Sequence, residues 1–124
     1  MAWGMLAFVV SVLLFGAGLQ VWMAWKTQAV RGKAVTGVAG TTGQGVELLW
    51  FHSPGCGPCK VMEPSVRELA KSHAVRMVDV TRDPDAAAQL GVMATPTTVV
   101  LRGGVVERVQ LGVVAPGALA AMLA

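Results

Sequence analysis

The stretch Cys56-Gly57-Pro58-Cys59 holds the only two cysteines of the chain and directs the interpretation of its fold. An apolar run at 46–51 (Val-Glu-Leu-Leu-Trp-Phe) precedes it and predicts a buried strand, and a helical pattern follows it. We therefore expect Cys56 at the start of a helix, where unpaired N–H groups and the helix dipole favour a thiolate. The thiolate is the reactive form, and the spacing lets Cys59 reach Cys56 and close a disulfide.

The two residues between the cysteines suit this change from strand to helix. Gly57 tolerates a tight turn, and Pro58 has the φ and the missing N–H that a first helical turn accepts. Two cysteines could instead be half of a zinc site, but such a site takes four ligands. His52 and His73 each stand alone, so the pattern favours redox chemistry, with a zinc-bridged dimer as the alternative.

Several further segments share the pattern of one known family. The segment 51–60 (Phe-His-Ser-Pro-Gly-Cys-Gly-Pro-Cys-Lys) resembles the active-site segment of the thioredoxin family. Pro64 matches the proline that bends the family's active-site helix, and 95–97 (Thr-Pro-Thr) resembles its cis-proline loop. Gly103-Gly104 matches its hairpin turn, and Gly112 a glycine near the end of its last strand. The resemblance runs from about residue 46 to the C-terminus.

This resemblance implies a thiol–disulfide oxidoreductase with no cofactor and no metal ligand. Cys56 would be the nucleophile that attacks a partner's disulfide, and Cys59 the resolving thiol that then displaces the partner. Pro96 would be cis and face the cysteines, with Thr95 near the sulfur of Cys56 and the adjoining backbone pairing with an incoming peptide. The expected partners are protein disulfide substrates and an upstream thiol/disulfide electron donor.

The chain departs from the family where the second cysteine needs a base. The family's buried aspartate aligns with Trp50, and the lysine that partners it aligns with Met77. Glu47 and His52 are the replacement candidates by proximity in sequence alone. The simpler interpretation makes Glu47 a solvated residue at the start of a strand and His52 a packed or surface residue. The base that assists Cys59 is therefore open at this point.

Residues 1–25 contain no charged side chain and predict a membrane anchor. The run is long enough to span a hydrocarbon core of about 30 Å. Trp3 lies at one end and Trp22 and Trp25 at the other, where aromatic rings favour the interface. A cleaved signal peptide is the alternative, but no Lys or Arg precedes the apolar core and the core is too long. We predict an uncleaved, single-pass helix in the cytoplasmic membrane.

The charges that follow this helix suggest on which side the rest of the chain lies. Lys26, Arg31 and Lys33 come after the helix and no basic residue precedes it. The positive-inside rule then favours the cytoplasmic face. The extracytoplasmic side is the alternative, because many membrane-tethered relatives of thioredoxin work there. Residues 26–45 are rich in glycine and predict a flexible linker, with a weak pattern for an edge strand over 34–38.

The remaining residues, 46–124, predict one domain with a trimmed α/β, thioredoxin-like core. Strands and helices in the order βαβαββα would form a central mixed sheet flanked by helices. Three of the ten basic residues precede this domain, leaving seven against seven acidic residues, which argues against a nucleic-acid partner. The predicted strands cover 46–51, 75–80, 97–101 and 105–111, and the predicted helices 59–72, 83–90 and 115–123.

Three functions are compatible with these patterns. The leading hypothesis is a membrane-tethered thiol–disulfide oxidoreductase. A second is a metal-handling module in which Cys56 and Cys59 hold copper(I) or zinc as soft thiolate ligands. A third is a non-catalytic assembly protein that keeps the fold in order to bind a membrane complex.

Overall fold

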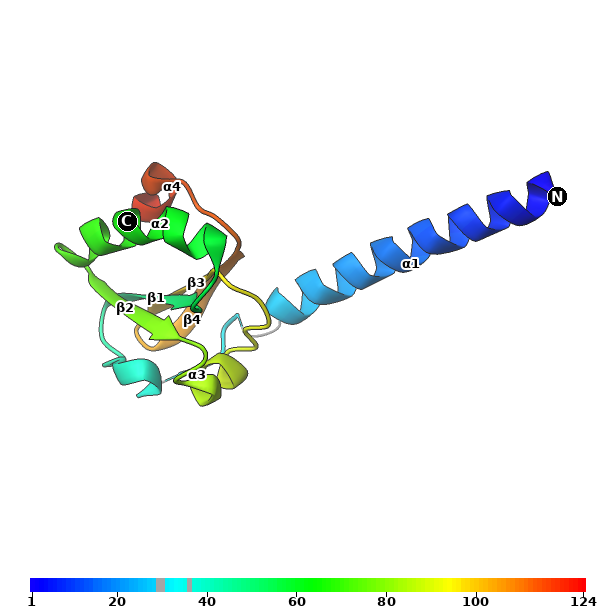
Figure 1. The fold of residues 1–124 in the computed structure, drawn as a ribbon. Coiled ribbons are helices and arrows are strands. Elements are labelled where there is room, and N and C mark those ends of the chain that lie inside the picture. The colour runs from blue at the N-terminus through cyan, green and yellow to red at the C-terminus, as the bar shows by residue number, and fades with distance from the viewer. Residues whose placement is uncertain (29–30, 36) are drawn as a thin grey trace.

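A computed structural model describes residues 1–28, 31–35 and 37–124 (Figure 1). One long helix projects from a domain built of a four-stranded sheet with helices on both faces. The elements in chain order are α1 (Ala2–Gln28), the short 3-10 helix η1 (Val38–Gly40), β1 (Val46–His52), α2 (Gly57–Ala70), β2 (Ala74–Asp79), α3 (Pro84–Gln89), β3 (Thr97–Arg102), β4 (Val105–Leu111) and α4 (Pro116–Ala121).

The sheet is mixed, with the strand order β2-β1-β3-β4. β1 pairs with β2 in parallel and with β3 in antiparallel fashion, and β3 pairs with β4 in antiparallel fashion. His52 is opposite Asp79, Phe51 is opposite Thr97, and Thr97 is opposite Leu111. The ends of β1, β2 and β4 therefore meet the start of β3 at one end of the sheet.

The central strand β1 divides the core into two layers. Leu48 and Trp50 pack against α2 and α4, whereas Leu49 and Phe51 pack on the opposite face against α3. This division follows from the alternation of side chains along a strand. All four are at most 1% exposed, so β1 is fixed from both sides and gives the loop that follows it a firm support.

The predicted order of elements is confirmed, and the differences lie at element ends. The helix predicted over 59–72 begins two residues earlier, at Gly57, and ends at Ala70, because Gly57 and Pro58 are themselves helical behind Cys56 as N-cap. The last helix is shorter than predicted, Pro116–Ala121. β2 lies one residue before its predicted position, and β1 and β3 each continue one residue further than predicted.

The segment expected to be a flexible linker, 26–45, differs from that expectation. α1 continues through Gln28, and the segment 31–35 lies along β4. Gly32 N donates to Val106 O (2.7 Å) and Val35 N donates to Gly104 O (2.6 Å). The edge strand expected over 34–38 is reduced to one bridge, Ala34 with Val105, and Thr36 lies outside the described residues.

Two valines of this segment also join the core. Val35 is 4% exposed and Val38 is 8% exposed, and both belong to the layer beneath α3. The sequence pattern missed this packing because a glycine-rich stretch without periodicity gives no sign of a distant partner strand. The described residues of 31–45 are thus part of the domain.

Helix α1 has the length and composition to cross a membrane. Its span Ala2–Lys26 has a mean hydropathy of 2.1, and none of its most apolar part is buried against the domain. Its large apolar side chains, such as Leu13, Leu14 and Phe15, are exposed along the helix. A lipid environment would cover such a surface.

Candidate functional site

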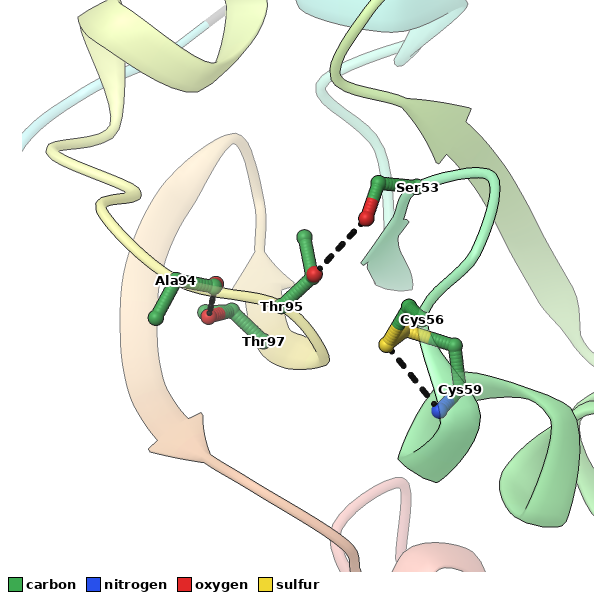
Figure 2. The surroundings of a disulfide bond; sticks show 6 residues. All are labelled: Ser53, Cys56, Cys59, Ala94, Thr95 and Thr97. Atoms are coloured by element: carbon green, nitrogen blue, oxygen red, sulfur yellow. Dashed lines mark hydrogen bonds between the residues drawn. A yellow bond between two sulfur atoms is a disulfide. The ribbon is translucent and has the colours of Figure 1, made fainter.

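Cys56 and Cys59 form a disulfide at the N-terminus of α2, with their Cα atoms 5.3 Å apart (Figure 2). Cys56 has an extended backbone as the N-cap of the helix, and its Sγ accepts a hydrogen bond from Cys59 N (3.2 Å). A thiolate at this sulfur could accept the same bond and would lie at the positive end of the helix dipole. Cys56 is half-buried and Cys59 is 3% exposed, so Cys56 is the sulfur that a partner can reach.

The loop before Cys56 explains how the strand passes into the helix. Gly55 has a φ of +76°, a left-handed conformation that favours glycine over any residue with a side chain. Gly57 and Pro58 then begin α2, and Pro58 lies in the first turn, where no N–H is required.

The loop before β3 faces this disulfide at the same end of the sheet. The Thr95–Pro96 peptide bond is cis, and Gly112 N donates to Pro96 O (2.9 Å). Thr97 Oγ1 donates to Ala94 O (2.6 Å). The structure thus brings Thr95, 36 residues after Cys59, to the loop that leads into Cys56 (Figure 2).

One hydrogen bond connects the two loops. Ser53 Oγ lies 3.0 Å from Thr95 Oγ1, and Figure 2 shows the two hydroxyls pointing toward one another beside the disulfide. The Thr95 hydroxyl, expected near the sulfur of Cys56, therefore has Ser53 as its hydrogen-bond partner. Sequence reasoning did not identify Ser53, and its position directly after a strand that leads to the cysteines is the signal that could have done so.

A cavity of about 240 Å³ opens beside the disulfide. Trp50 and His52 lie on its strand side, and their rings stack with centroids 4.9 Å apart and an interplanar angle of 22°. Trp50 Nε1 is buried and has no hydrogen-bond partner within the described part of the chain. The other side chains that line the cavity include both cysteines, Lys60, Glu63 and Asp79.

Asp79 is held in its ionised form at the edge of this cavity. Thr81 donates to Asp79 Oδ1 from its hydroxyl (2.6 Å) and from its N–H (2.9 Å), and these bonds lower the pKa of Asp79 below 3.8. The charges of His52 and Arg82 lower this pKa further. The resulting stability is present above the ordinary aspartate pKa and is lost as the pH falls through the lowered value. Sequence reasoning missed Asp79, because only the strand register places it opposite His52.

Glu47 is neither solvated nor near the cysteines, so both interpretations of this residue are wrong. Its side chain is 1% exposed and accepts hydrogen bonds from Thr42 N (2.8 Å), Thr42 Oγ1 (3.2 Å) and Gly43 N (3.2 Å). It lies at the opposite end of β1 from the disulfide. The three donors compensate for burying a carboxylate, so the role of Glu47 is to hold the loop before β1.

Known proteins share the sequence pattern of this domain. The sequence model of one family, described as thioredoxin, matches residues 41–124. The thioredoxin of Bacillus subtilis is 36% identical over 75 residues, which are 57% of this chain and 72% of that protein. The thioredoxin of Alicyclobacillus acidocaldarius is 36% identical over 61 residues, which are 46% of this chain and 58% of that protein.

Solved structures of two further proteins superpose on this fold. A mutant thioredoxin from Halobacterium salinarum superposes with a TM-score of 0.62 at 32% identity, over 64% of this chain and 73% of that one. The thioredoxin of Fasciola hepatica gives a TM-score of 0.60 at 29% identity, over 65% of this chain and 81% of that one. In both cases the similarity concerns about two thirds of this chain.

Proposed function

This chain belongs to the thioredoxin family of thiol–disulfide oxidoreductases, and from that premise we propose that it exchanges disulfides with protein partners while α1 tethers it to a membrane. The observation that carries the proposal is the Cys56–Cys59 disulfide at a helix N-terminus with one accessible sulfur. The membrane part is supported by the length and apolar surface of α1.

The reaction proceeds by two sulfur displacements. In the reduced protein the Cys56 thiolate attacks one sulfur of a partner disulfide, and the other partner sulfur leaves as a thiolate and takes up a proton. Cys59 then loses its proton and attacks the Cys56 sulfur, which releases the second partner thiol. Two electrons pass from the cysteine pair to the partner, and the pair closes into the disulfide. An upstream thiol donor then reduces the Cys56–Cys59 disulfide and restores the two thiols.

The loop at Thr95 and Pro96 is proposed to hold the partner during the first displacement. Its backbone borders the disulfide and could pair with an extended peptide as a short β-bridge. Gly57 and Pro58 support the reaction indirectly, because they allow the chain to enter α2 directly behind Cys56.

His52 is the group that we propose takes the proton from Cys59, in place of the aspartate that Trp50 replaces. Both His52 and Cys59 line the same cavity, and stacking on Trp50 fixes the plane of the imidazole. The Asp79 carboxylate opposite His52 would stabilise the imidazolium that results.

The other charged groups at the cavity are less suited to this role. Glu63 forms an ion pair with Arg67 (2.6 Å) on the outer side of α2. Lys60 is exposed and, as an ammonium, carries no free electron pair to accept a proton. Arg82 is not among the residues that line the cavity, and it lies 4.0 Å from Asp79, where it places a positive charge beside that carboxylate.

Replacing His52 with glutamine is expected to slow the second displacement about 10²-fold at pH 7, the lower end of what general acid–base catalysis contributes. The measurement is the release of thionitrobenzoate from a mixed disulfide preformed on Cys56 of the full chain. At pH 7 the wild-type chain should release thionitrobenzoate faster than the His52→Gln variant by this factor. His73→Gln is the matched control, because His73 is exposed in the turn between α2 and β2. Equal release rates for wild type and His52→Gln at pH 7 would remove His52 from the mechanism.

Insulin reduction tests the proposed activity itself. The full chain in detergent, supplied with dithiothreitol, should accelerate insulin precipitation, and a variant with serine at both cysteines should fall to the uncatalysed rate. Stoichiometric copper or zinc in the purified protein, with no acceleration, would instead support the metal-handling module. An inactive, metal-free protein would support the assembly role.

The side of the membrane on which the domain lies is a separate part of the proposal. Lys26, Arg31 and Lys33 favour the cytoplasmic face. Fusions of alkaline phosphatase and of green fluorescent protein to the C-terminus should then give fluorescence without phosphatase activity. The reverse result would place the domain outside the cytoplasm.

A further inference from the structure

We infer that the disulfide faces the membrane surface in which α1 is anchored, and that its partner is a membrane protein with a disulfide at the lipid–water boundary. This inference rests on the proposed function. Its main support is the direction in which the segment 31–35 runs along β4.

The domain is fastened close to the end of α1. Arg31 Nε donates to Glu107 O (3.2 Å), and Gly32 N donates to Val106 O (2.7 Å). Two residues, 29 and 30, separate Gln28 from Arg31 in the sequence, so the Cα atoms of Gln28 and Arg31 can be at most about 11 Å apart. The tether is therefore short, whatever path these two residues take.

The attached segment runs toward the end of the sheet where the disulfide lies. Ala34 pairs with Val105 in antiparallel fashion, so moving from Ala34 back toward α1 corresponds to moving along β4 toward Leu111. Leu111 is opposite Thr97, the residue that follows Pro96. Helix α1 contacts β4, and Figure 1 shows it leaving the domain on the side where α2 begins. The anchor and Cys56 thus share one end of the domain.

The position of the membrane boundary along α1 sets the distance between the membrane and β4. At the end of α1 nearer the domain, Trp22, Trp25 and Lys26 are suited to an interface, and Lys26 Nζ lies 4.8 Å from the centroid of the Trp22 ring. Helical rise adds about 3 Å from Lys26 to Gln28, so β4 begins its contact with the tether within about 15 Å of the boundary.

The short distance between the membrane boundary and β4 favours a partner that is itself in the membrane. A small folded domain is about 30 Å across, which is more than the roughly 15 Å between the membrane boundary and the point where the tether reaches β4. A soluble globular partner would have to enter that space, whereas a loop of a protein already in the membrane reaches it directly. Basic residues at the tether, Lys26, Arg31 and Lys33, suit a boundary of anionic headgroups.

Fluorescence quenching tests the orientation in the full chain reconstituted into vesicles with nitroxide-labelled headgroups. One sample carries a fluorophore on Cys56 in a Cys59→Ser variant. The other carries it on Gln44→Cys in a variant with serine at both native cysteines, since Gln44 is exposed at the opposite end of the sheet. We expect several-fold stronger quenching at Cys56. Equal quenching, or stronger quenching at position 44, would overturn the orientation.

A flexible insertion after Gln28 is the matched control for the tether. About 20 residues of glycine and serine span about 25 Å on average, enough to let the domain turn away from the surface. The difference in quenching between the two labelled positions should then largely disappear. A difference that survives the insertion would show that something other than the short tether orients the domain.

Single-turnover reduction of two membrane peptides tests the partner. One peptide carries its disulfide loop directly after its membrane span, and the other carries it beyond a helical spacer of about 60 Å. The pre-reduced full chain should reduce the near disulfide at least about tenfold faster, and the insertion variant should lose most of this preference. Equal wild-type rates would overturn the inference. Insulin reduction by the full chain in detergent, where no bilayer limits access to the disulfide, reports on the proposed function separately.

Discussion

Replacing Cys59 with alanine is expected to abolish turnover and to leave the full chain covalently joined to its substrate. The Cys56 thiolate at the N-cap of α2 can still attack a disulfide, but the thiol that would displace the substrate is gone. Insulin reduction should fall to the uncatalysed rate, and a mixed disulfide should accumulate on non-reducing gels and disappear with excess dithiothreitol.

Cys56→Ser is the matched control for this result. It should be equally inactive without forming the adduct, because Cys59 is 3% exposed and a substrate cannot reach it. An adduct on Cys59 in that variant would reverse the two roles. Substantial turnover by Cys59→Ala would show that external thiols resolve the intermediate.

Replacing Glu47 with alanine should destabilise the domain by about 2–3 kcal/mol, because it removes the buried acceptor of two part-buried N–H groups in the preceding loop. The N–H groups of Thr42 and Gly43 both point to this carboxylate. Urea unfolding of the full chain in detergent, followed by circular dichroism, gives the change in free energy.

Glu107→Ala is the matched control for Glu47. Its carboxylate pairs with Arg102 at 3.0 Å, but both side chains are about half exposed. The free energy of unfolding should therefore fall by less than about 1 kcal/mol. Equal losses in the two variants would mean that the bonds to the loop before β1 contribute little. The cysteine chemistry should persist in the folded Glu47 variant, since that residue lies at the far end of β1.

The sequence predicted those parts of the fold that depend on local patterns. The apolar run before Cys56 predicted β1, the two glycines after Arg102 predicted the β3–β4 hairpin, and Asp83-Pro84 predicted the start of α3. In each case the residues that form the feature are neighbours along the chain. The cysteine pair at the start of a helix belongs to the same class.

The features that escaped prediction depend on residues far apart in the sequence. Glu47 resembles a solvated strand residue until the fold brings the loop at Thr42 over it. The Ser53–Thr95 hydrogen bond joins positions 42 residues apart. His52 gains Asp79 as a neighbour through the register of two parallel strands. Local propensity carries no information about such pairings, so the surroundings of Cys59 could be described only once the sheet was known.

The position of β2 at the edge of the sheet has a consequence for the membrane-anchored state proposed above. No strand lies outside β2 within the described residues, so one row of its backbone groups faces outward. Such an edge can pair with the same edge of another molecule. The proposed anchoring would confine the copies to one plane and so make these encounters frequent. Arg76, exposed in the middle of β2, opposes this pairing by charge repulsion. Its charge would thus help to keep crowded copies from aggregating.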